Sequence, residues 1–142
     1  MDIILQLSAA AILVLSFGIL FQAPKKSLVW LSITGILGWG AFLLSQNVGS
    51  YNIITSSFVA SIFIALSGEI FARVLKMPVT VFVIPGIIPL VPGVPAYNTM
   101  LSLVKGEYIQ GVETGIDTLL IAGAIAFAIA TIGAIADFSV FK

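Results

Sequence analysis

Long uncharged apolar runs, separated by a few charged residues, make up most of the chain. No charged residue lies between Asp2 and Lys25, and none lies between Lys26 and Glu69. The second run is too long for one membrane helix, and its turn-forming cluster at 46–52 divides it in two. The resulting segments are close to the ~20 residues that cross a bilayer as a helix. The pattern predicts an all-α membrane protein with spans at 3–22, 28–45, 53–75 and 118–136, and an interrupted fourth segment at 79–95.

Proline and glycine interrupt this fourth segment. Four prolines fall within eleven residues, and two glycines lie among them. Each proline removes a backbone donor and clashes with the preceding turn, which excludes a straight helix. In lipid, the freed carbonyls need a protein partner or a water-filled cavity. We therefore predict a helix that is broken or re-entrant, followed by an amphipathic helix; a kinked structural helix is the alternative. The interrupting residues are Pro85, Gly86, Pro89, Pro92, Gly93 and Pro95.

The composition places the whole chain in the membrane as a single domain. Of 142 residues, 60% are hydrophobic and 8% are charged, whereas soluble domains carry about 25% charged residues. Basic and acidic residues number 6 each, so no nucleic-acid surface is predicted. The chain has no histidine and no cysteine, which excludes disulfides, thiolate catalysis and the usual zinc sites. No catalytic motif is visible, and we expect no enzyme activity, no cofactor and no metal.

Lysine and arginine indicate how the spans are oriented. Lys25 and Lys26 follow the first span, and Arg73 and Lys76 lie at the end of the third. Two spans separate the pairs, so all four residues share one side of the membrane. Because loops rich in lysine and arginine stay in the cytoplasm, we predict a cytoplasmic location for this side and an external N-terminus. The first run lacks a basic leader, which favours an uncleaved span in the inner or plasma membrane.

The basic residues do not decide how the segment 79–104 is placed. If it crosses the membrane, Lys105 lies outside and Lys142 inside, whereas a re-entrant segment exchanges the two. Each arrangement leaves one lysine on the disfavoured side. The first helical part measures about 20 Å at 1.5 Å per residue, which is short of a bilayer core of about 30 Å. We predict five crossings, the fourth with extended backbone.

Small residues recur at helical spacing on two spans. Small side chains let membrane helices approach closely, so such stripes are typical of packing seams, although alanine is also common in membrane helices. We predict that both stripes pack against other helices. The stripe on the third span is Ser57, Ser61, Ala65 and Gly68, and that on the last span is Ala122, Ala126, Ala130 and Ala134.

The proline-glycine break is the first candidate site. Pro95 suits the first turn of a helix over 96–108, where its missing donor costs nothing. The free N–H groups of Ala96, Tyr97 and Asn98 would then face the break and form an anion site for a carboxylate. The side chains of Tyr97 and Asn98 would add donors. The residues predicted to bind substrate or line its path are Pro85, Pro89, Pro92, Gly93, Tyr97 and Asn98.

Two acids are candidates for proton coupling. Glu69 and Arg73 lie four residues apart, so they share one face of the third span and can form an ion pair. This pair is interpreted either as an interfacial pair that reaches toward water or as a gate or proton-accepting carboxylate. Asp117 is predicted to open the last span, where an aspartate suits the helix dipole. Its alternative role is proton coupling within the membrane boundary.

The C-terminal half resembles the threonine/serine exporter family. The resemblance rests on a Pro-Leu-hydrophobic-Pro-Gly pattern, a tyrosine four residues after the glycine, an amphipathic helix, a glycine and a final span rich in alanine and glycine. Upstream, it rests on the span count and on Gly68 and Arg73. The residues that carry the pattern are Pro89, Leu90, Pro92, Gly93, Tyr97, Gly111 and the span at 118–136.

The resemblance implies export of threonine and serine, or of the dicarboxylate succinate, driven by proton entry. Full-length members have about twice the spans and a soluble N-terminal region, so the chain resembles the small, separately encoded half. A larger subunit is its implied partner, and an odd span count would give the two halves opposite orientations, as in inverted repeats. Two alternatives are a homo-oligomeric channel or carrier and a structural subunit that transports nothing.

Overall fold

The computed structural model describes residues 3–49 and 51–140, with side chains as far as Ala136. It confirms the all-α prediction: the described residues form helices joined by short turns. Four helices are long and apolar enough to cross a membrane, and a bent pair makes a fifth. The elements are α1 (Ile3–Leu20), η1 (Lys25–Ser27), α2 (Leu28–Asn47), α3 (Ile53–Leu75), α4 (Thr80–Ile87), η2 (Ile88–Leu90), α5 (Gly93–Val104) and α6 (Tyr108–Val140).

The helix ends lie close to the predicted bounds for α1, α2 and α3, whereas α5 and α6 begin earlier than expected. The turn expected at 46–52 separates α2 from α3, and the Asn52 side chain caps α3 by accepting from the Thr55 N–H at 2.9 Å. The α6 helix begins at Tyr108, although the span was predicted from residue 118. Asp117 therefore lies inside α6, and its predicted place at a helix start is wrong. The turn after α5 is short because Gly106, with a φ of +82°, reverses the chain within a few residues.

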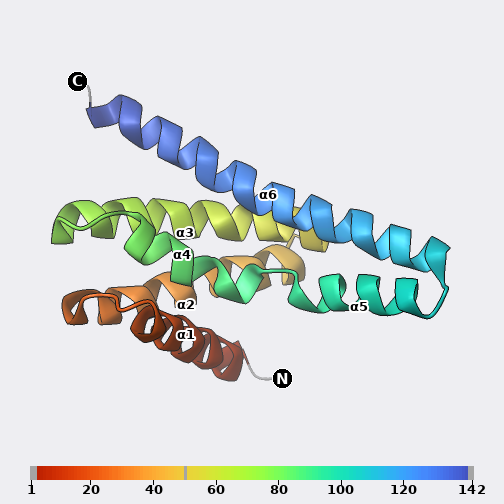
Figure 1. The fold of residues 1–142 in the computed structure, drawn as a ribbon. Helices are drawn as coiled ribbons and strands as arrows, with labels where there is room; N and C mark the ends of the chain where they lie inside the picture. The colour runs from red at the N-terminus through yellow and green to blue at the C-terminus, as the bar shows by residue number, and fades with distance from the viewer. Residues whose placement is uncertain (1–2, 50, 141–142) are drawn as a thin grey trace.

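The α3 and α6 helices run side by side in the same direction (Figure 1). Near the start of α3, Phe58 stacks on Phe127 with ring centroids 6.2 Å apart. Near its end, Arg73 donates from Nη2 to the carbonyl oxygen of Ala136 at 3.1 Å. The contacts follow the same order along both helices, so α3 and α6 are parallel. The α1, α2 and α3 helices, by contrast, pack as successive antiparallel neighbours (Figure 1).

The α4 helix packs closely against both α2 and α3. A Cβ atom added to Gly86 of α4 would lie 2.9 Å from side-chain carbons of Thr34 on α2 and Ile64 on α3. One added to Gly38 on α2 would lie 2.4 Å from the same isoleucine. Real Cβ contacts are longer than this, so these glycines allow the three helices to approach one another. Ile64 is 1% exposed and fills the space where they meet.

The two predicted small-residue seams differ in what covers them. All four residues of the α3 stripe are buried, which confirms a packing seam there. The α6 stripe is exposed, and Cβ atoms added to Gly123 and Gly133 would meet nothing within 4 Å. The side of α6 that packs in this chain carries Ile121, Ile125 and Ala128 instead. The α6 seam is therefore not formed within the described part of the chain.

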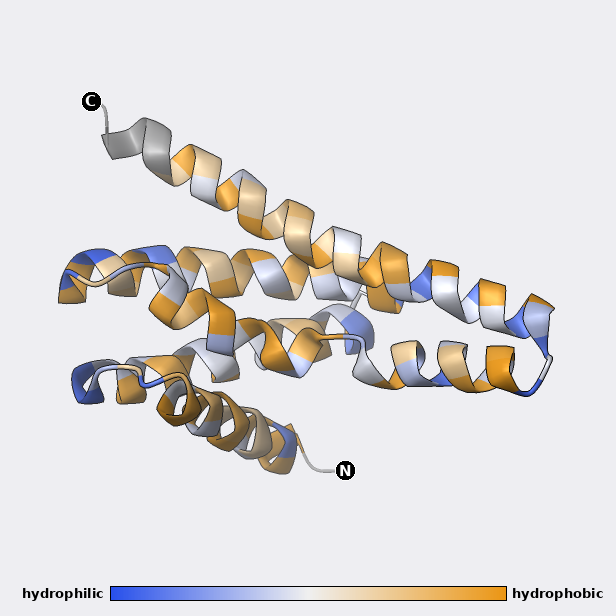
Figure 2. Ribbon diagram, in the orientation of Figure 1, coloured by the Kyte–Doolittle hydropathy of each residue, from blue (hydrophilic) through white to orange (hydrophobic). Residues whose placement is uncertain are grey.

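Polar residues gather at the two ends of the molecule and at the turn between α2 and α3 (Figure 2). One end carries the turn between α1 and α2 and the end of α3, with Lys25, Lys26, Arg73 and Lys76. The other end carries the hairpin of α5 and the start of α6, which extends beyond the ends of α2 and α3 (Figure 1). Between the ends, the helices are mostly apolar. The distribution is that of a bundle that crosses a membrane.

Candidate functional site

The backbone at the proline-glycine break makes its own replacement hydrogen bonds. A proline leaves the carbonyl four residues earlier without its usual helical donor. For Pro89 that carbonyl belongs to Pro85, and it accepts from the Ile88 N–H. For Pro92 it belongs to Ile88, which accepts from the Val91 N–H at 3.3 Å. For Pro95 it belongs to Val91, which accepts from the Gly93 N–H at 2.8 Å. Tighter turns thus satisfy three of the carbonyls that the prolines free.

The two sides of the break differ in burial. On the α4 side, Phe82 and Pro85 are fully buried, and Leu90 is 6% exposed in a cluster with residues of α2, α3 and α6. After the break, Gly93 is exposed and a Cβ added to it would meet nothing within 4 Å. Tyr97, on the first turns of α5, is 66% exposed. The break therefore joins α4, which is packed inside the bundle, to α5, whose first turns are exposed, with a bend of 52° between the two parts.

The anion site predicted from free N–H groups at 96–98 is not present. The α5 helix begins at Gly93 rather than at residue 96, so these residues lie within the helix. The Ala96 N–H donates to the carbonyl of Pro92 at 3.0 Å. Pro95 does fall in the first turn, as predicted, and has no N–H to offer. Near this end of α5, the side chains of Tyr97 and Asn98 are exposed and offer donors to a solute.

The hairpin of α5 and α6 sets Tyr97 and Asp117 at one level. Gly111 packs on Leu103, and the Thr99 hydroxyl donates to the Thr114 hydroxyl at 3.2 Å. These contacts fix an antiparallel register in which the level of residue 97 on α5 matches that of residue 117 on α6. Both side chains are exposed. The two predicted residues therefore lie at similar depth, just beyond the break, although no contact joins them.

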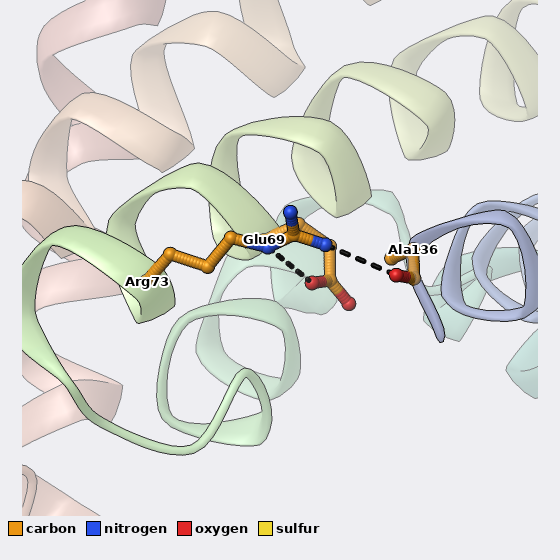
Figure 3. Close-up of polar contacts among 3 residues, drawn as sticks. All are labelled: Glu69, Arg73 and Ala136. Carbon is orange, nitrogen blue, oxygen red and sulfur yellow. Dashed lines mark hydrogen bonds and ion pairs between the residues drawn. The ribbon is translucent and has the colours of Figure 1, made fainter. Parts of the chain in front are cut away.

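Glu69 and Arg73 form the predicted pair near the end of α3 (Figure 3). Arg73 Nε lies 3.9 Å from Glu69 Oε2, and Nη2 of the same side chain donates to the Ala136 carbonyl oxygen of α6. The Glu69 side chain is 21% exposed and that of Arg73 52% exposed. The arginine thus links the ends of two parallel helices, while the carboxylate lies deeper. The sequence did not predict that Arg73 donates to Ala136, because the side-chain pattern does not indicate a bond to a backbone carbonyl 63 residues away.

Glu69 lies between two small cavities. One, of about 210 Å³, lies between α3 and the end of α6 and is lined by Glu69, Arg73 and Ile132 among others. The second, of about 230 Å³, reaches α4 and is lined by Glu69, Thr80, Ile84 and Ile132. Their walls are otherwise mostly apolar. The structure thus brings Glu69 beside the packed half of the broken helix, and leaves Tyr97, Asn98 and Asp117 on the hairpin.

The described residues contain no group of three acids that could hold a metal ion. A bundle of membrane-spanning helices, the fourth of them discontinuous, is the architecture of a multi-pass integral-membrane protein, and discontinuous helices are common in solute transporters. The chain matches the family model described as Threonine/Serine exporter, ThrE, over residues 6–135. It therefore belongs to the threonine/serine exporter family, as its proline-glycine pattern predicted. No solved structure matches the chain.

Proposed function

We propose that this chain is one subunit of a secondary transporter that exports small carboxylate-bearing metabolites across the cell's inner membrane. Threonine and serine, or succinate, are the proposed substrates. Export is coupled to proton entry and requires a larger partner subunit of the same family. Family membership supports the exporter role; the substrates, the coupling to protons and the partner subunit are the further points of the proposal.

The observation that carries the proposal is the change in burial along the broken helix. The α4 side is held between α2 and α3, while Gly93 and the start of α5 stand open. In a membrane, irregular backbone is tolerated where it is covered by protein or lines a water-filled cavity. We propose that the open side of the break faces a partner protein, and that the space between the two is the path.

The proposed path offers hydroxyl and amide donors to a carboxylate. Tyr97 and Asn98 are exposed on the first turns of α5, and Pro85, Pro89, Pro92 and Gly93 shape the backbone that leads to them. Both proposed substrate classes carry a carboxylate, which a phenol and an amide can bind through hydrogen bonds. A partner subunit supplies the remaining contacts.

Glu69 is the better supported candidate for proton coupling. Its carboxylate lies at two cavities and next to α4, so a change in its charge acts directly on the helix that leads to the break. Arg73 binds α6 at the same level and forms the proposed gate. Asp117 is an alternative, because it shares the depth of Tyr97 and carries a charge beyond the break.

Uptake of labelled threonine, serine and succinate into inverted membrane vesicles tests the proposal. This chain is measured alone and with the larger partner, with and without a proton gradient. Gradient-dependent uptake only with the partner is the expected result, and it also identifies the substrate. Uptake by this chain alone would instead support a homo-oligomeric carrier or channel. No uptake in any arm would contradict the transport role and leave a structural subunit.

A further inference from the structure

A groove of about 400 Å³ lies between the end of α1 and the start of α4, at the basic end of the molecule. One wall comes from the turn after α1, and the other comes from the first turns of α4. Phe21 is 50% exposed and Ile84 is 47% exposed, so the groove opens onto the outer surface of the bundle. Its lining residues are Phe21, Gln22, Ala23, Pro24, Thr80, Val81, Ile84 and Pro85.

Exposed lysines flank both walls of this groove. Lys25 and Lys26 directly follow the first wall, and Lys76 lies four residues before the second. Among the side chains that the structure describes, Glu69 is the acid at this end, and it pairs with Arg73. No described acid forms an ion pair with the lysines, so their charges are available to an anionic group at the mouth of the groove. Its interior combines apolar side chains with the Gln22 amide and the Thr80 hydroxyl.

We propose that this groove binds an anionic phospholipid. With the basic end of the bundle at the membrane surface, the lysines reach the lipid headgroups, and the groove runs from them along apolar side chains toward the hydrocarbon. Basic pockets between membrane helices bind anionic headgroups in this way. The apolar walls favour a lipid over free phosphate, because a soluble anion leaves Phe21 and Ile84 uncovered. The bound lipid joins the end of α1 to the packed half of the broken helix.

Tryptophan fluorescence in vesicles tests this site. Trp30 packs in the same cluster as Ala23 and Val81, two groove residues. A W39F background leaves Trp30 as the sole tryptophan, because the chain contains 2. The protein is placed in vesicles of phosphatidylcholine with a small fraction of brominated phosphatidylglycerol or brominated phosphatidylcholine. The brominated anionic lipid is expected to quench Trp30 more strongly at equal mole fraction.

Substitutions separate the groove from a general attraction to charge. A lysine near the surface contributes about 1 kcal/mol to anionic-lipid binding, or roughly fivefold. K25Q, K26Q and K76Q are each expected to reduce the lipid preference by about that factor, while K105Q, at the other end, leaves it unchanged. T80F is expected to fill the groove and abolish the preference with every lysine intact.

Three results would overturn the proposal. Equal quenching by the two brominated lipids would show that no selective site exists near Trp30. An unchanged preference in T80F would show that the lysines attract lipid without the groove. Relief of quenching by soluble glycerol phosphate would assign the site to a free phosphate instead. Circular dichroism and gel filtration in detergent confirm that each variant is folded.

Discussion

Gly86 and Gly93 belong to the same broken helix but have different surroundings. A Cβ atom at Gly86 meets Ile64 and Thr34 at 2.9 Å, whereas one at Gly93 meets nothing within 4 Å. Sequence alone treats the two glycines alike, since both lie among prolines in apolar sequence. Packing therefore distinguishes a glycine needed for helix contact from a glycine available for another surface.

The G93L and G86L variants test this difference. We expect G93L to reach the membrane in normal amounts and remain folded, because a Cβ at this position meets no atom within 4 Å. Export is expected to fall to background, because the side chain enters the proposed path. G86L is expected to lose folded protein, since overpacking costs about 1–3 kcal/mol. Normal export by G93L in the vesicle assay would refute the assignment of the break as the path.

Replacing Glu69 with glutamine tests proton coupling. The E69Q variant keeps the shape of the side chain and leaves the bond from Arg73 to Ala136 available, so the fold is expected to persist. Uptake is expected to lose its dependence on the gradient and fall to the level seen without one. E113Q, which alters an exposed acid of the hairpin, serves as the matched control. Full gradient dependence in E69Q would exclude this carboxylate as the proton carrier.

At the scale of helices, the sequence predicted most elements because their signals are local. Apolar runs bounded by charges or by a turn cluster predicted α1, α2 and α3, and the prolines predicted the break in the fourth helix. The start of α6 was missed because Glu113 and Asp117 end the apolar run while the helix continues through them. That continuation depends on packing against α5, where Gly111 meets Leu103, and no single-helix pattern shows it.

The parallel course of α3 and α6 bears on the placement of 79–104. Two helices that cross a membrane in the same direction require a crossing in the opposite direction between them. A re-entrant segment would have made α6 antiparallel to α3. The bend of 52° between the two parts of the fourth helix is also too small to return the chain to its starting side. We therefore expect a crossing; Lys142, whose side was also predicted, lies outside the described residues.

Labelling at Lys105 measures this crossing directly. The chain has no native cysteine, so K105C provides one thiol in the turn after α5. On intact cells, an impermeant maleimide is expected to label K105C and to leave K26C, at the other end of the bundle, unlabelled. Labelling of K26C and protection of K105C would reverse the predicted orientation. Protection of both in intact cells, with labelling after lysis, would indicate a re-entrant segment.

At the scale of the whole molecule, the chain leaves much apolar surface uncovered. The alanine stripe of α6 is exposed, and so are Val94, Val104, Ile109 and Val112 on the projecting hairpin. Lipid can cover such residues within the bilayer, but α6, at about 50 Å for 33 residues, is longer than the bilayer core of about 30 Å. The sequence predicted the α6 seam but not its lack of a partner within the chain, because spacing does not say which helix fills a seam.

Bulky residues on the two small-residue surfaces are expected to act differently. A60L, at a fully buried site on α3, should overpack the bundle and lower the amount of folded protein. A126L, on the exposed stripe of α6, should leave this chain folded on its own but reduce its copurification with the larger subunit at least tenfold. Copurification of A126L at the wild-type level would show that the stripe faces lipid.

The parallel pairing of α3 with α6 also sets an order of biogenesis. The α2 and α3 helices each pack on the helix made directly before them, so that neighbour already exists when each is made. The α3 face that carries Glu69 is covered by α6 only after the rest of the chain has been inserted, since α6 is the last helix made. Until then, Glu69 has α4 on one side but lacks the α6 residues on the other. The final helix supplies Ile132, Ile135 and Ala136 to the cavity that Glu69 lines, and so completes the surroundings of this carboxylate.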